Sequence, residues 1–404
     1  MGERKRKRGW NGNVKVVLVL LVIVSCIVFT KVKVDTYRRY ESSTSSYEKA
    51  EVIQVIENNV ELDERTKEYY VGSQELLVKL KTGAQKNSQI QVTNYLTASH
   101  NVYTSEGSRV IVCVDAPENV EPYYSIYNYD RSNAIYLTGA VFFLLLVAIG
   151  GRKGIRSGIS IIFTMYMIVK VLIPLLYNGK SAVLVSLLVS MVCGAVSILL
   201  ISGIHKKAMI DVFTTLTGLA LAGGLYWMLE VAYHVSGYQT EEAQGLILIA
   251  QNTGLQIKGI LFAGVLISSL GALMDVVISL SASIEELNKV NGKLTRKQLF
   301  LSGLTIGKDM IGTMSNTLIL AFTGGALTTL LVLTSYGVGY HQLLSSDYLA
   351  IELAKGLAGT GAVILMVPVT SFICSIYQKQ EKYEIKIKIK NVSGGKECTI
   401  LEES

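Results

Sequence analysis

The stretch SLGALMDVVISLSASIEEL, residues 269–287, sets one carboxylate, Asp275, in the middle of an otherwise apolar run. An Asp at the centre of a membrane-spanning helix costs roughly 2.5 to 3.5 kcal/mol on insertion scales, so such a residue usually has a function. On a helix, small and hydroxyl-bearing residues share its face: Ser268, Gly271, Asp275, Ser279 and Ser283. The opposite face carries Leu266, Leu273 and Val277. We therefore expect the polar face to pack inward against a second helix.

The next apolar run, residues 302–325, has the same design. Its polar face carries Ser302, Thr305, Asp309, Thr313 and Asn316. Asp309 follows Lys308 and a basic loop, so it fits a pathway residue and equally an acid near the start of a helix, where the helix dipole favours it. Glu352, near the start of the last apolar run, is open to the same two interpretations.

These patterns predict two groups of residues. The first lines a substrate or ion pathway: Asp275, Asp309, Ser279, Thr313, Asn316 and Glu352. The second consists of glycines that allow helices to approach closely: Gly271, Gly303, Gly307 and Gly312. We expect no catalytic residue, metal or cofactor, because the chain has no recognisable catalytic or nucleotide-binding motif and no cysteine spacing typical of a zinc site.

Composition places the chain among membrane proteins. Of its 404 residues 50% are hydrophobic and 17% are charged, compared with about 25% charged in soluble domains. Basic residues cluster beside apolar runs and lack interleaved aromatic residues, which argues against nucleic acid as a partner. The lipid bilayer and a small-molecule or ion substrate are the expected partners, together with a homo-oligomer or a complex with a related membrane protein.

Apolar runs of spanning length predict about eight transmembrane helices. One is residues 14–31, and seven fall within residues 134–377, centred on Leu145, Met165, Val192, Leu219, Val265, Leu327 and Ile364. Lys and Arg concentrate in alternate connections, residues 150–158, 205–207 and 288–298, and in the tail 378–404. By the positive-inside rule, both termini are cytoplasmic. The sequence thus predicts a multi-pass protein of a bacterial cytoplasmic membrane.

The two ends of the chain leave alternatives open. Residues 1–13 are basic, and the following apolar run fits an uncleaved anchor. The segment IVSC, which ends at Cys26, also loosely resembles a lipoprotein processing site. In the tail segment KYEIKIKIKNV, residues 382–392, Ile alternates with Lys from residue 385 to residue 390, which favours a surface strand over a segment lying on anionic lipid.

Residues 35–131 differ from the rest of the chain, because they are polar and rich in Ser and Tyr. Four segments alternate apolar and polar residues in the manner of strands: residues 51–59, 75–83, 88–96 and 108–116. They predict a small extracytoplasmic β-barrel or sandwich that is inserted after the first transmembrane helix, into an otherwise α-helical polytopic bundle.

Four segments resemble the hallmark segments of the YibE/F family of bacterial membrane proteins: GRKGIRSGIS, GALMDVVISLSASIEEL, IGKDMIGTMSNTLILAFTG and GTGAVILMVPVTS. The resemblance covers about residues 134–377. The matching positions are Gly271, Asp275, Ser279, Gly307, Asp309, Gly312, Thr313, Asn316 and Thr317. It implies a multi-spanning bacterial protein, of a family whose members are at most suggested to be permeases.

Three functions remain open. The first is a permease for a small molecule or ion that uses a polar seam around Asp275 and Asp309. The second is an intramembrane aspartyl protease that uses the same two acids, although Lys308 precedes Asp309 where such proteases have a Gly-x-Gly-Asp run. The third is a non-catalytic membrane scaffold with an external binding domain. The first is favoured, so the chain is more readily a transporter than an enzyme.

Overall fold

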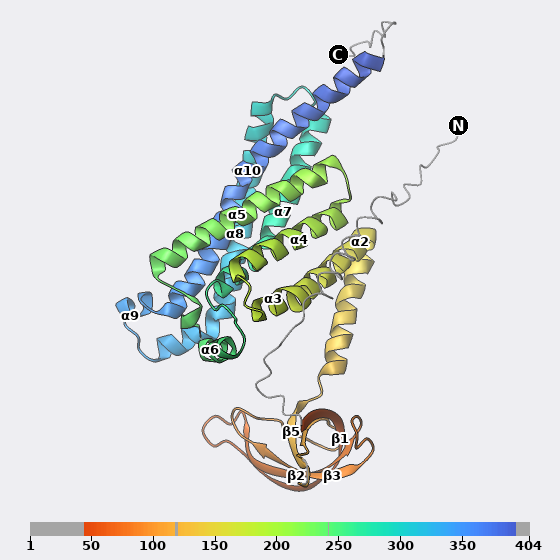
Figure 1. Ribbon diagram of the computed structural model, residues 1–404, viewed down its shortest axis with the longest axis vertical. Helices are drawn as coiled ribbons and strands as arrows, with labels where there is room; N and C mark the ends of the chain where they lie inside the picture. Colours follow the sequence, from red (N-terminus) through yellow and green to blue (C-terminus); the bar gives the residue numbers. More distant parts are fainter. Residues whose placement is uncertain (1–43, 118–119, 241, 393–404) are drawn as a thin grey trace, which may run out of the picture. The chain divides into compact units, whose positions relative to one another are not determined.

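The computed structural model describes residues 44–117, 120–240 and 242–392, with side-chain burial to residue 378. Figure 1 shows the chain, which divides into two compact units. One is formed by residues 38–149 and contains a β-sheet, and the other is helical and is formed mainly by the chain from Gly150 onward. The first predicted anchor, residues 14–31, lies outside the described residues.

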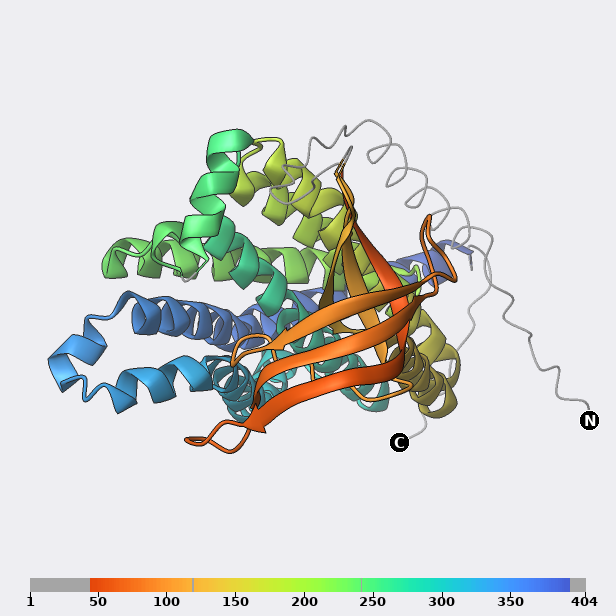
Figure 2. The ribbon, with the colours of Figure 1, turned by 90° about the horizontal axis from the view of Figure 1, so that it is seen from below.

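The β-unit is a five-stranded antiparallel sheet. Its strands are β1 (Ser45–Leu62), β2 (Tyr70–Leu80), β3 (Gln89–Leu96), β4 (Arg109–Asp115) and β5 (Tyr123–Tyr129). They are hydrogen-bonded in the order β3-β2-β1-β4-β5, and the 18-residue β1 pairs with both β2 and β4. Two register shifts let β1 bend, and the sheet curves into a half-barrel (Figure 2).

Alternating side chains form the core of this half-barrel. On β2 and β4 every second residue is buried, among them Leu76, Val78, Val110 and Val112 at 0% exposure. The four predicted strands are therefore confirmed. The fifth, YYSIYNY, escaped prediction because tyrosines occupy most of its positions and only Ile126 is a buried aliphatic residue.

The helical elements follow in chain order. They are α2 (Ser132–Met167), the π-helical η1 (Ile168–Leu172), α3 (Ile173–Tyr177), α4 (Ala182–Ser202), α5 (Lys206–Tyr233), the short 3₁₀ turn η2 (Gly237–Gln239), α6 (Ala243–Asn252), α7 (Ile260–Val290), α8 (Arg296–Ser335), α9 (Tyr340–Leu344) and α10 (Asp347–Val392). Local signals explain several ends. For example, Thr295 and Gln298 form a capping box that starts α8.

Six helical segments of the described residues are long and apolar enough to cross a membrane: Ser132–Tyr177, Ala182–Ser202, Lys206–Tyr233, Ile260–Val290, Arg296–Ser335 and Asp347–Gln378. A multi-spanning protein is thus supported, while the count of eight stays a prediction. The runs centred on Leu145 and Met165 both fall in the first segment. Gly151 separates them with a non-helical φ of 52° and ψ of −130°, a conformation that glycine adopts readily.

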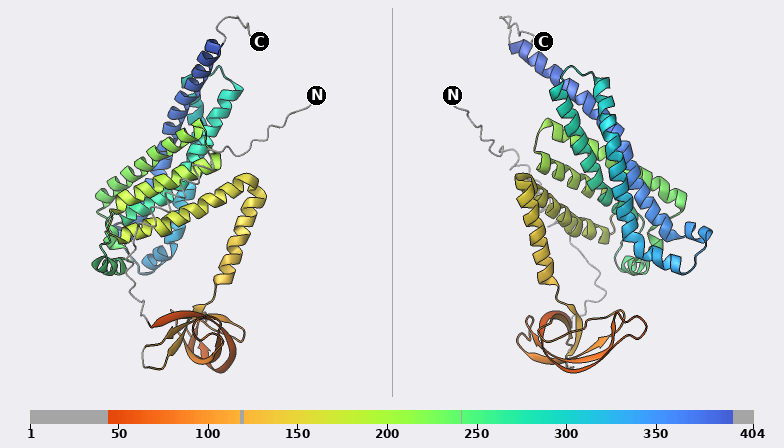
Figure 3. Two further views of the ribbon diagram at one scale, coloured as in Figure 1. Left: turned by 45° about the vertical axis from the view of Figure 1, so that its right-hand side comes forward. Right: turned by 180° about the vertical axis from the view of Figure 1, so that it is seen from behind.

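The core of the helical unit lies where α5, α7 and α10 meet, and α8 packs along α10. Both views of Figure 3 show α8 and α10 running side by side. Helix α10 continues to Val392, so the predicted surface strand at residues 382–392 is wrong. Between Pro368 and Val392 there is no glycine or proline to end the helix. The Gln, Glu and Lys residues of this segment are good helix formers.

Candidate functional site

The apolar face of α7 points inward, which reverses the expected orientation of this helix. Leu266, Leu273 and Val277 are all 0% exposed, whereas Asp275 is exposed. The reason is steric as well as hydrophobic. An added Cβ at Gly218 of α5 would lie 3.2 Å from a methyl group of Leu273, so the missing side chain makes room for the α7 leucine. The expectation that the polar face of α7 packs inward within one chain is therefore wrong.

The outward stripe of α7 consists of small and polar residues: Gly264, Ser268, Gly271, Asp275, Ser279 and Ala282. A similar stripe runs along α8, with Thr305, Lys308, Asp309, Gly312, Thr313, Asn316 and Thr317 all exposed. Only 6% of the most apolar part of α8 is buried, compared with 50% for α7. The two predicted pathway segments therefore lie on the outside of the described helical unit.

No hydrogen bond or ion pair joins Asp275 and Asp309 within the described part of the chain. The hydroxyls on their stripes bond to their own helices instead. Thr313 Oγ1 donates to the carbonyl of Met310 at 3.1 Å, and Thr317 Oγ1 donates to the carbonyl of Thr313 at 2.9 Å. The side chains on these stripes therefore offer the two carboxylates no hydrogen bonds inside one chain.

The four predicted packing glycines fall into two pairs. Gly303 lies against Ser371 of α10, where an added Cβ would come within 2.7 Å of the Ser371 hydroxyl, and Gly307 lies directly against Val367 of α10. Gly271 and Gly312 have nothing within 4 Å of such a Cβ. Close packing of α8 on α10 thus depends on the first pair, while the second pair is on the outward stripes.

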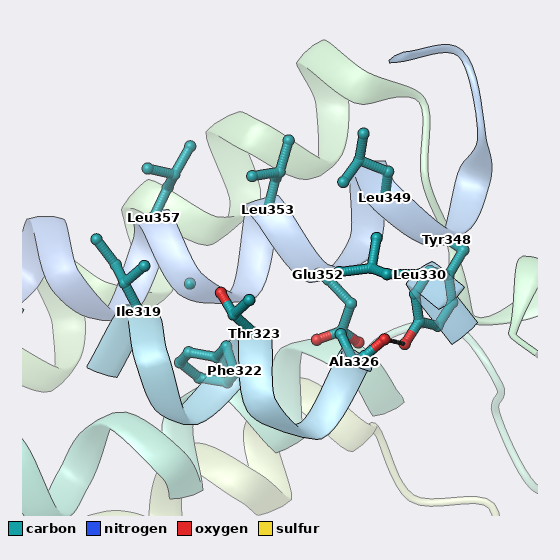
Figure 4. A pocket seen from close by; sticks show the side chains of 11 residues that line it. Ile319, Phe322, Thr323, Ala326, Leu330, Tyr348, Leu349, Glu352, Leu353 and Leu357 are labelled. Carbon is teal, nitrogen blue, oxygen red and sulfur yellow. Dashed lines mark hydrogen bonds between the residues drawn. The ribbon is translucent and has the colours of Figure 1, made fainter. Parts of the chain in front are cut away.

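Glu352 lies in a groove between α8 and α10 with a volume of about 170 Å³. Figure 4 shows its carboxylate directed into the groove toward α8. The groove is otherwise mainly apolar, with Phe322, Leu330, Leu353 and Leu357 among its lining residues. Lys355 Nζ lies 2.7 Å from the Glu352 carboxylate, so the charge is already neutralised by a residue one turn away.

A carboxylate that the sequence analysis did not single out, Asp211 of α5, is the most deeply buried acid in the described part of the helical unit. Asp211 is 1% exposed, and within the described residues neither of its carboxylate oxygens accepts a hydrogen bond of regular geometry. The hydroxyl of Ser281 on α7 lies beside it, but that hydroxyl donates to the carbonyl of Ile278 at 3.4 Å.

Further unsatisfied hydroxyls belong to the same layer of the bundle. Thr214 and Thr215, three and four residues after Asp211, are buried, and neither Oγ1 has a partner. On α10, Thr370 Oγ1 is likewise buried and unpartnered. An added Cβ at Gly218 would lie 2.7 Å from Met366 Sδ. Further along α10, the charge of Asp211 acts on Cys374, one turn after Thr370, so this part of α10 lies near Asp211.

An ion pair flanks this layer. Lys207, one turn before Asp211, lies 2.7 Å from the Glu285 carboxylate of α7, and Lys289 lies 2.7 Å from the other oxygen of the same group. The charges of Lys207 and Glu285 act on Asp211. Glu285 holds both lysines, and among the described residues no ion pair neutralises the buried carboxylate of Asp211.

An uncompensated carboxylate in this position is unstable, since burying a lone charge in an apolar environment costs many kcal/mol. Asp211 is therefore a candidate for holding a proton or a small cation. The hydroxyls of Thr214 and Thr215, one turn further along α5, are the nearest of these groups along the helix and offer oxygen ligands or hydrogen-bond donors for either state. No group of three or more His, Cys, Asp or Glu residues able to hold a metal ion occurs among the described residues.

The sequence does carry a signal for Asp211 in the segment HKKAMIDVFTTLTG. Ala208, Asp211, Thr214, Thr215 and Gly218 recur at helical spacing, the same design as the stripe on α7. Here the stripe is buried, from Ala208 at 0% exposure to Thr215 at 1%. Asp211 was not singled out from the sequence because it is close to Lys206 and Lys207, a position that suggests an acid at the membrane interface.

Comparison with known proteins gives one match. The family of YibE/F-like proteins matches residues 138–380, a range that contains Asp211, Asp275, Asp309 and Glu352. No curated protein and no solved structure matches the chain.

Proposed function

We propose, starting from the fact that the chain belongs to the YibE/F-like protein family, that it is a permease in which Asp211 binds the coupling proton or monovalent cation. One observation carries the proposal: both carboxylate oxygens of Asp211 are buried and unpartnered. If Asp211 had only a structural role, we would expect a neighbouring helix to donate a hydrogen bond to it. Without such a bond, burial of the carboxylate destabilises the folded state by its full desolvation penalty.

The location of Asp211 fits such a coupling group. The positively charged connections favour an orientation in which α5 starts at the cytoplasmic side, both termini are cytoplasmic and the β-unit is outside. Asp211 lies five residues after the first residue of α5, so a proton or ion reaches it from the cytoplasm through about 7 Å of protein. Exchange at this point requires only a local movement of α5 relative to α7 and α10.

The solute pathway is assigned to the outward stripes of α7 and α8. Asp275 and Asp309 would be costly in contact with lipid, and the small residues on α7 favour close approach of another helix. A second copy of the chain provides a suitable cover. In a two-fold contact the same face meets itself, so Lys308 of one copy and Asp275 of the other supply opposite charges. Ser279, Thr313 and Asn316 then line the seam between the copies.

Transport in proteoliposomes tests this function. Purified protein would be exposed to steps of amino acids, sugars, organic acids and inorganic ions on a solid-supported membrane, at several pH values and with Na⁺, K⁺ or neither. We expect a current or uptake signal for one solute class that depends on pH or on one cation. Asp211→Asn should abolish the coupled signal while leaving the amount and orientation of inserted protein unchanged.

A matched control is available on the same helix. Glu230 of α5 is also acidic, but it is not among the fully buried residues, so Glu230→Gln should retain coupled transport. Wild-type transport by Asp211→Asn across the pH series would contradict the proposed coupling role. A protein that moves none of the solutes under any gradient would contradict the permease itself.

A further inference from the structure

The β-unit carries a hollow that the permease proposal does not use. It has a volume of about 380 Å³ and lies where β3 and β5, the two ends of the sheet, approach each other. We call it the aromatic hollow and define it by six of its lining residues: Thr93, Tyr95, His100, Tyr123, Ser125 and Tyr127.

Three tyrosine rings of the aromatic hollow are left open to solvent. Tyr95, Tyr123 and Tyr127 are 63%, 64% and 55% exposed, and they come from both ends of the sheet. Tyr47 of β1 packs edge-on against Tyr127, with ring centroids 4.8 Å apart, and so fixes the orientation of that ring. Single exposed aromatic residues are ordinary, but three around one hollow form a surface of the kind that binds a ligand.

The chemistry of the lining restricts the ligand. Among the described residues, no Lys, Arg, Asp or Glu lines the aromatic hollow. Its polar groups are hydroxyls, the amide of Asn94, the thiol of Cys113 and the imidazole of His100, which are neutral or weakly basic hydrogen-bonding groups. A second hollow of the same unit differs sharply, because it is lined by Lys49, Glu51, Lys81 and Asp130, which are already engaged in ion pairs with one another.

We infer that the aromatic hollow binds a neutral saccharide. Sugar rings combine apolar C–H faces, which pack on tyrosine rings, with hydroxyls that hydrogen-bond to Ser, Thr and His side chains. Phosphate and carboxylate ligands, including nucleic acids, are disfavoured because no cation lines the site. In the proposed orientation the hollow faces the outside of the cell.

Binding is measured on the full chain in lipid nanodiscs. Triacetylchitotriose and maltohexaose serve as neutral probes, and an oligogalacturonate of similar length serves as an acidic one. Isothermal titration and saturation-transfer NMR should detect at least one neutral probe, with signals from the ring C–H protons that contact tyrosine. The acidic probe should bind at least about tenfold more weakly, a difference of about 1.4 kcal/mol.

Two variants locate the binding site. Tyr95→Ala and Tyr127→Leu should each weaken binding by about tenfold, since a well-placed aromatic contact is worth about 0.5–1.5 kcal/mol. The leucine keeps apolar bulk on β5, so that a loss of affinity reports on the ring and not on the fold. Ile56→Ala removes a side chain that is 48% exposed on the same unit, outside the hollow, and should leave affinity unchanged.

Failure of both neutral probes to bind, equal binding of the acidic probe, or unchanged affinity in both tyrosine variants would overturn the inference. Each result is independent of transport through the helical unit.

Discussion

Lys207 of α5 and Glu285 of α7 form an ion pair across the bundle with an N–O distance of 2.7 Å, one helical turn from the unpartnered Asp211. Because Lys207 is held in this pair, it makes no ion pair with Asp211. The side chains of Lys207 and Glu285 are only 19% and 28% exposed, so the attraction is stronger than that of a pair in bulk water. We regard the pair as the arrangement that keeps Asp211 available for an exchangeable proton or cation.

Glu285→Gln should release Lys207 to pair with Asp211, because the two are one turn apart on α5. The expected result is transport that no longer depends on pH or on the coupling cation. Thermal unfolding in nanodiscs across a cation series would show the same change, since a bound cation stabilises the folded state by mass action. Glu286→Gln, at the exposed neighbouring position, is the matched control. Equal cation dependence in both variants would show that the ion pair does not govern Asp211.

Gly307→Ala should lower the thermal stability of the protein, whereas Gly312→Ala should not. An alanine is favoured over glycine by about 1 kcal/mol in a helix interior. At Gly307 that gain is outweighed, since the new methyl group would collide with Val367, and such overpacking costs about 1–3 kcal/mol. Gly312→Ala meets nothing within 4 Å in one chain and should be neutral or stabilising. Melting temperatures of the two purified variants give the comparison. A lower value for Gly312→Ala than for Gly307→Ala would contradict the packing of α8 on α10.

Helical packing of this kind was only partly predictable. Apolar runs indicate where helices lie, and the alternating valines of β4 indicate a strand, because burial of one face imposes its period on the sequence. The direction in which a polar stripe points carries no such signature. The stripes around Asp211 and Asp275 have the same spacing, yet one is buried and the other exposed. Which face of a helix is buried depends on the room that the neighbouring helix offers, as Gly218 of α5 does for Leu273 of α7. The sequence of one helix alone does not contain this information.

The seam between two copies predicts a contact that crosslinking detects. Ser279→Cys and Thr313→Cys lie on the outward stripes of α7 and α8 and should form disulfide-linked or bismaleimide-linked dimers in native membranes. Leu273→Cys, at a position that is 0% exposed inside the chain, should remain monomeric. Equal crosslinking of all three would indicate random collision, and no crosslinking at either outward position would exclude a second copy as the cover.

The β-unit should lose stability in acid. Asp130 accepts hydrogen bonds from the hydroxyl and the backbone N–H of Ser132 and pairs with Lys49 at 3.2 Å. The Ser132 hydroxyl is the main cause that lowers the pKa of Asp130 below its usual range, and the Ser132 N–H and Lys49 add to it. A lowered pKa means that the folded state favours the charged form, so this stabilisation is present above the unfolded-state pKa of about 3.9 and is lost as pH falls through the lower folded-state value.

Asp130→Asn should therefore melt earlier than the wild type at neutral pH and show a shallower loss of stability on acidification. Circular dichroism at pH 7 and pH 3, with the β-signal followed on heating, provides the measurement. Asp63→Asn changes a residue whose pKa is also lowered, by hydrogen bonds with the following turn at Thr66, and which is only partly buried; it should have a smaller effect. If the two variants behave alike, Asp130 has no special role at the start of α2.

The central claim, that Asp211 carries an exchangeable proton or cation, is tested most directly by infrared difference spectroscopy of the full chain in nanodiscs. Spectra would be recorded between acidic and alkaline pH, with and without Na⁺ or K⁺, for the wild type, Asp211→Asn and Asp275→Asn. We predict a carbonyl band of a protonated carboxylic acid that disappears on raising the pH or adding the coupling cation, that is retained in Asp275→Asn and is missing in Asp211→Asn. Identical pH and cation difference spectra for the wild type and Asp211→Asn would contradict the claim.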